Sequence, residues 1–130
     1  MGLLLLEYLF VLIFLAVLTR TPSAERSFNL TPFWSYEAVR NGRTDLLVQN
    51  IANVGAFVPV GLLLGCVLGK DRWGKVLLVG GGFSVLIETL QFVLRRGFTE
   101  FDDVWHNVVG CAVGLGVYMG VEFLIKKISM

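Results

Sequence analysis

Four apolar stretches, separated by polar segments, run along the chain. They cover residues 2–19, 50–68, 76–94 and 104–125. A helix rises about 1.5 Å per residue, so about 20 apolar residues cross a hydrocarbon core of about 30 Å. The pattern therefore predicts an all-α, polytopic membrane protein: a four-transmembrane-helix bundle with residues 1–130 forming a single transmembrane domain.

The longest polar segment lies between the first two apolar stretches and covers the 30 residues 20–49. It carries Phe33, Trp34 and Tyr36 around Pro32. Amphipathic aromatic rings are enriched at the membrane–water interface, although the same rings could stack on a ligand. We expect an interfacial loop of 30 residues between the first two helices.

Polar residues recur within the last three apolar stretches at spacings of three and four. Residues so spaced share one face of a helix. The face on the third stretch is formed by Ser84, Glu88, Gln91 and Arg95; Asn50 with Asn53, and Asp103 with Asn107, begin faces on the second and fourth. A charge at the centre of a membrane helix costs about 2.5–3.5 kcal/mol on insertion scales, so Glu88 should face a partner or a water-filled cavity. We expect these polar faces to converge on one pocket.

Composition supports a membrane protein. Charge and residue spacing argue against nucleic-acid binding and against a metal site. The chain is 55% hydrophobic and 16% charged, with a mean hydropathy of +0.74. A formal net charge of +1 provides no basic surface for nucleic acid. Cys66, Cys111 and the single His106 show no metal-ligand spacing, so we expect neither a metal site nor a cofactor.

The lysines indicate how the bundle is oriented. Four spans would place both termini on the side that also holds the turn at Lys70. Lys75, Lys126 and Lys127 lie close to the membrane on this side. Lysine and arginine favour the cytoplasmic side of a membrane. We therefore expect a multi-pass protein of the bacterial cytoplasmic membrane with both termini in the cytoplasm, and a polar pocket that opens outward.

An ordered set of motifs covers nearly the whole chain. It comprises Asn29-Leu-Thr-Pro-Phe33, Asn50 with Phe57-Val-Pro59-Val-Gly61, Glu88-Thr-Leu-Gln91, Arg96 with Asp102-Asp103, and Asn107-Val-Val-Gly110. This set resembles the VanZ-like family. The resemblance implies a small multi-span protein of the bacterial envelope, associated with resistance to teicoplanin and related glycopeptides. It implies no particular mechanism.

The candidate ligand-binding residues combine the polar faces with these motifs. They are Asn29, Asn50, Asn53, Glu88, Gln91, Arg95, Arg96, Asp102, Asp103 and Asn107. In the favoured hypothesis the pocket binds membrane lipids, namely a lipid-linked cell-wall precursor or another anionic headgroup, and so lowers glycopeptide susceptibility. Arg95 and Arg96 would clasp phosphate with their forked donors.

Two alternatives remain open. The chain could be an intramembrane enzyme acting on a lipid phosphate or pyrophosphate, with Glu88 and Asp103 as candidate catalytic residues and Asp102 beside Asp103 as a carboxylate pair for a divalent cation. The absence of an activated nucleophile makes an enzyme the less favoured reading. It could also be a structural or regulatory subunit, in which Asp102 simply caps a helix. The sequence leaves the oligomeric state undetermined.

Overall fold

The computed structural model describes all of residues 1–130, and most of them are helical. α1 (Gly2–Ile13) continues into a π-helical turn, η1 (Phe14–Leu18); α3 (Thr44–Leu68), α4 (Trp73–Val93) and α5 (Phe101–Ile128) follow. Helices α3, α4 and α5 are long and apolar enough to cross a membrane, whereas Gly2–Leu18 is a shorter apolar helical segment. The chain is a helical membrane protein, as expected. A fourth span at α1 stays a prediction.

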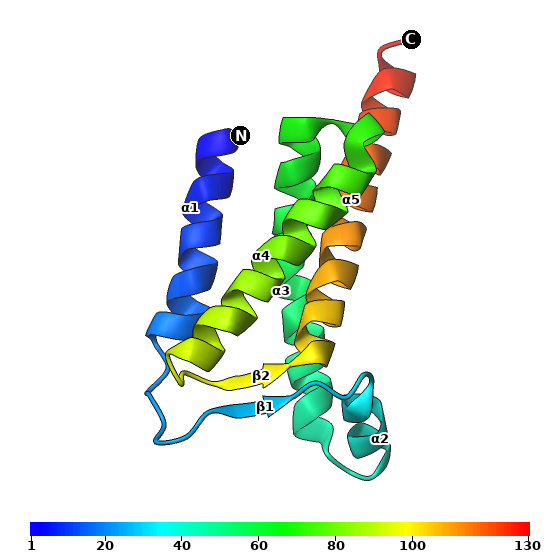
Figure 1. The fold of residues 1–130 in the computed structure, drawn as a ribbon. Helices are drawn as coiled ribbons and strands as arrows, with labels where there is room; N and C mark the ends of the chain where they lie inside the picture. Colours follow the sequence, from blue (N-terminus) through cyan, green and yellow to red (C-terminus); the bar gives the residue numbers. More distant parts are fainter.

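The two ends of the bundle differ (Figure 1). One end holds both termini and the turn η2 (Lys70–Arg72) between α3 and α4. The other holds α2 (Trp34–Arg40) and a parallel pair of short strands, β1 (Ser27–Asn29) and β2 (Phe98–Glu100), and we call it the strand end. Strands within an expected all-α chain are a difference from the sequence analysis.

Residues 20–49 are also more structured than a plain loop. They contain β1, α2 and the first turns of α3, which begins at Thr44, before Asn50. Pairing of β1 with β2 runs from Ser27 opposite Phe98 to Asn29 opposite Glu100. The segment after α1 is thereby fixed against the connection between α4 and α5.

Glycines bring α3 and α5 into close contact. A Cβ built on Gly110 would overlap the carbonyl of Val54, and one built on Gly114 would overlap the carbonyl of Val58. Small residues allow membrane helices to approach in this way. Since Asn53 precedes these contacts on α3 and Asn107 precedes them on α5, the close packing also holds the two polar faces together at the strand end.

Candidate functional site

Three carboxyl groups from different elements meet at the strand end. Glu88 lies on α4, Glu100 ends β2, and Asp103 lies in the first turn of α5; they are 6%, 3% and 8% exposed. Glu88 Oε2 accepts a hydrogen bond from the backbone N–H of Glu100 at 3.0 Å. We call these three residues the carboxyl cluster.

Amides from α3 hold the carboxyl cluster. Gln49 Nε2 donates to Glu100 Oε2 at 2.6 Å and lies 3.3 Å from Asp103 Oδ1, while Asn53 Nδ2 donates to Asp103 Oδ1 at 2.7 Å. Burial, reinforced by the charge of Asp103, raises the pKa of Glu100 to about 7. A carboxyl group with a pKa in this range exchanges protons near neutral pH.

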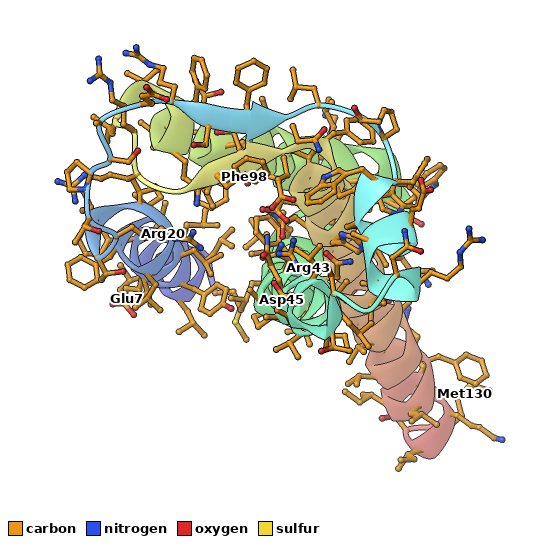
Figure 2. The ribbon with its side chains drawn as sticks, turned by 90° about the horizontal axis from the view of Figure 1, so that it is seen from below. Glu7, Arg20, Arg43, Asp45, Phe98 and Met130 are labelled. Atoms are coloured by element: carbon orange, nitrogen blue, oxygen red, sulfur yellow. The ribbon has the colours of Figure 1, made fainter.

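A small enclosed cavity lies on the inner side of the carboxyl cluster. Its volume is about 80 Å³, enough for a few water molecules or a small polar group. The charged and amide side chains that line it include Arg20, Asn53, Glu88, Gln91, Asp103 and Asn107. Figure 2, seen from below, shows Arg20 beside α1. We call this space the inner cavity.

A larger apolar groove lies on the other side of Glu88. It has a volume of about 460 Å³ and is lined by Phe28 and Leu30 from the β1 segment, by Val85, Thr89 and Phe92 from α4, and by Phe101 and Val104 from α5. Glu88, Thr99 and Glu100 complete its wall. We call it the outer groove. Glu88 thus lines both the outer groove and the inner cavity.

Asp102 faces a different helix from its neighbour Asp103. It is completely buried and accepts hydrogen bonds from the backbone N–H of Phe33 at 2.6 Å, from the backbone N–H of Ser35 at 3.0 Å, and from the Ser35 hydroxyl. Asn50 Nδ2 lies 3.2 Å from the same hydroxyl. Asp102 therefore caps α2 rather than its own helix, and it does not share a cation-sized space with Asp103.

The remaining predicted residues lie outside the carboxyl cluster. Arg95 Nη1 donates to the carbonyl of Ala24 at 3.1 Å, and Arg96 Nη1 donates to the carbonyl of Arg20 at 2.8 Å. These bonds use part of each guanidinium, which carries five donors. Asn29 Oδ1 accepts from the backbone N–H of Thr31 at 3.0 Å, a local turn.

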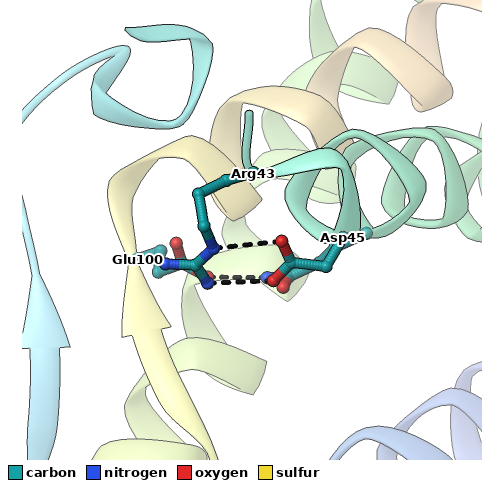
Figure 3. Close-up of polar contacts among 4 residues, drawn as sticks. Arg43, Asp45 and Glu100 are labelled. Carbon is teal, nitrogen blue, oxygen red and sulfur yellow. Dashed lines mark hydrogen bonds and ion pairs between the residues drawn. The ribbon is translucent and has the colours of Figure 1, made fainter. Parts of the chain in front are cut away.

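Neighbouring charges at the strand end include a surface ion pair. Arg43 donates to Asp45 through Nε at 3.0 Å and Nη2 at 2.9 Å (Figure 3). The Arg43 and Asp45 side chains are 60% and 63% exposed. This pair marks the beginning of α3 and makes no bond to the carboxyl cluster.

Several residues of the site were not predicted as site residues from the sequence. They are Arg20, Ser35, Gln49 and Glu100, together with His106, whose Nε2 lies 2.7 Å from the hydroxyl of Tyr36. Gln49 stands four residues before Asn53, so helical spacing could have identified it. Arg20 follows the first apolar stretch, where a basic residue is typical of an interfacial anchor.

Comparison with known proteins gives one family and one curated relative. Residues 3–125 match the family model described as VanZ/LLP1. The chain is 36% identical over 98 residues to Protein VanZ of Enterococcus faecium; the alignment covers 72% of this chain and 53% of that protein. The chain thus spans about half the length of this relative. No solved structure matches the chain.

Proposed function

We propose, since this chain belongs to the VanZ/LLP1 family, that it lowers bacterial susceptibility to teicoplanin-type glycopeptides. In this proposal the chain binds a lipid-linked cell-wall precursor, or another lipid with an anionic headgroup, in the cytoplasmic membrane. Both termini are cytoplasmic, and the strand end faces outward. Binding there would change the access of a glycopeptide to its target.

The position of Glu88 carries the proposal. A hydrocarbon chain in the outer groove would lie against aromatic and aliphatic side chains, and its burial is favourable in proportion to apolar area. The polar end of the same lipid would meet Glu88 and the carboxyl cluster. Arg20, Arg95 and Arg96 at this end of the bundle retain donors for a phosphate group.

The depth of Glu88 agrees with a headgroup-level site. Glu88 precedes Val93, the last residue of α4, by five positions, which is roughly 8 Å along a helix. A polar group there is within reach of the membrane interface. This depth favours the polar head of a lipid over a solute that crosses the whole membrane.

A groove-filling substitution tests lipid binding. Thr89→Trp places an indole in the outer groove, whereas Leu78→Trp, on the same helix, alters a side chain that is 75% exposed and outside the groove. We expect cells producing Thr89→Trp to lose teicoplanin protection and cells producing Leu78→Trp to keep it, at equal membrane abundance. Full protection with Thr89→Trp would contradict the proposal.

The orientation has its own test. Glu37 is exposed on α2 at the strand end, and Asp71 is exposed in the turn at the opposite end. In a background without native cysteines, Glu37→Cys should react with a membrane-impermeant thiol reagent in intact cells, and Asp71→Cys should not. The reverse labelling would place the strand end in the cytoplasm.

The pKa of Glu100 supports a second candidate function, enzymatic action on a lipid phosphate or pyrophosphate. Neighbouring carboxyl groups whose environments separate their protonation are typical of acid–base pairs. Glu88 and Asp103 would exchange protons with the substrate, and Glu100 would tune them. Purified chain should then release phosphate from such lipids, Glu88→Gln should abolish release, and Glu100→Gln should shift its pH dependence. Without turnover in the parent protein, the binding function stands alone.

A further inference from the structure

Two buried oxygen acceptors in the inner cavity have no donor. Gln91 Nε2 donates to the carbonyl of Ala16 at 3.0 Å, which leaves Gln91 Oε1 without a partner. Asn107 Nδ2 lies 2.8 Å from Ser84 Oγ, which leaves Asn107 Oδ1 without one. Gln91 is 4% exposed and Asn107 is 5% exposed, and both line the inner cavity. Buried polar groups are normally hydrogen-bonded, so these atoms indicate a missing donor.

The charged side chains around the inner cavity are mostly acidic, which would complement a positively charged donor. Glu88 and Asp103 line it, and Glu100 adjoins them through its backbone bond to Glu88. Arg20 is the one basic residue in the lining, and it forms no ion pair with either carboxylate within 4.0 Å. The cavity therefore combines oxygen acceptors with an excess of carboxyl groups.

We propose that the inner cavity binds the primary ammonium group of a lipid whose hydrocarbon lies in the outer groove. A primary ammonium is compact and carries three donors and no acceptor, which matches a lining of carboxyl and amide oxygens. A metal ion is a poorer match, because no group of three or more Asp, Glu, His or Cys side chains is placed to hold one. Arg20 would face the phosphate beside the ammonium.

This inference rests on the proposed lipid-binding function and identifies the group that the site recognises. The ammonium has two chemical sources. One is the headgroup of an aminophospholipid. The other is a free amine on the peptide of a lipid-linked precursor. Both present the same three N–H donors, so the site itself would accept either.

Successive N-methylation of one headgroup tests the recognition. We would measure the retention of dioleoyl phosphatidylethanolamine, its N-methyl forms and dioleoyl phosphatidylcholine by the full chain in detergent, using native mass spectrometry. Each methyl group on the ammonium removes a donor while the charge remains. We expect retention to fall with each added methyl group, by about tenfold for each hydrogen bond to a charged group that is lost, so that phosphatidylethanolamine is retained at least tenfold better than phosphatidylcholine. Equal retention across the series would overturn the inference.

Two substitutions separate the ammonium from the phosphate. Glu88→Gln should remove most of the preference for phosphatidylethanolamine, whereas Glu37→Gln, which alters an exposed carboxylate on α2, should leave it unchanged. Arg20→Gln should weaken retention of phosphatidylethanolamine and phosphatidylglycerol alike, because both contain phosphate. If Glu88→Gln fails to fold, the methylation series on the parent protein still decides.

A second pair of ligands distinguishes the sources. A lipid-linked precursor with a free amine is compared with the same precursor after N-acetylation. Preference for the free amine assigns the site to the precursor, and preference for phosphatidylethanolamine alone assigns it to a membrane lipid; both support the inference. Absence of any amine preference overturns it. The teicoplanin protection of cells producing the parent and Thr89→Trp tests the proposed function separately.

Discussion

Asp102 should be the residue on which the docking of α2 depends. α2 has seven residues, Trp34–Arg40, and isolated helices of this length are unstable in water. Phe33, at its N-cap, has a left-handed backbone with φ of 60°. The carboxylate of Asp102 accepts the N–H of Phe33, and that of Ser35 two residues later. Phe33 also packs edge-on against Trp105, and the Tyr36 hydroxyl lies 2.7 Å from His106 Nε2. Asp102 is the residue that satisfies the N–H groups at the start of the helix.

Asp102→Asn keeps the size of the side chain and removes one acceptor. Its amide NH₂ must face a backbone N–H or the Ser35 hydroxyl, so at least one buried donor loses its partner. A hydrogen bond to a charged group contributes about 1.5–3 kcal/mol, and a stranded buried donor costs about 1–3 kcal/mol. We expect the free energy of unfolding to fall by about 2–4 kcal/mol. The loss is not larger because α2 can detach and hydrate its N–H groups.

Thermal unfolding in detergent and limited proteolysis would measure this change. At about 4 °C per kcal/mol, Tm should fall by about 8–16 °C. Trypsin should cut faster after Arg40, the last residue of α2, and after Arg43, three residues beyond it. The matched control is Asp45→Asn, because Asp45 pairs with Arg43 at the surface and should leave Tm nearly unchanged. Equal melting and equal cleavage of the two variants would refute the role of Asp102.

Two further predictions concern packing and protonation. Gly114→Ala, whose methyl group would overlap the carbonyl of Val58, should lower stability by about 1–3 kcal/mol in thermal unfolding, whereas Gly116→Ala meets nothing within 4 Å and should not. Glu100 has a pKa raised from 4.5 to about 7, so the stabilisation by its proton is complete below pH 4.5 and is lost as pH rises to about 7. Glu100 faces the charges of Asp102 and Asp103 and is bonded through its backbone N–H to Glu88. Glu100→Gln should therefore flatten the fall in Tm between these pH values. An unchanged slope of Tm against pH would contradict this assignment.

The helical spacing of residues in the sequence predicted the features that lie within a single helix. The apolar stretches coincide with helices because each must satisfy its own backbone groups within lipid. Gly110 and Gly114 are four residues apart, a spacing typical of close helix contact, and the structure places both against carbonyls of α3. These features depend on residues three or four apart, which a sequence displays directly.

The different partners of Asp102 and Asp103 could not be predicted in the same way. Consecutive residues on a helix point about 100° apart, so a pair of aspartates at a helix start necessarily faces two directions. Which partners lie in those directions depends on how residues 20–43 return to the bundle. From the sequence, the two aspartates could form a cation site, or Asp102 could cap a helix. The structure assigns Asp102 to α2 and Asp103 to α3.

Formation of the carboxyl cluster depends on a chain reversal rather than on helical spacing. After α4, Arg95 and Gly97 adopt positive φ angles of 55° and 109°, and the chain turns into β2. Pairing with β1 then fixes Glu100 opposite Asn29, and this position directs the Glu100 backbone N–H at Glu88. Gly97 adopts its positive φ without the steric penalty that a Cβ would cause. A side chain at this position would also contact the Arg20 guanidinium. The reversal therefore couples three features of the site: the turn, the partner of Glu88, and the position of Arg20 at the inner cavity.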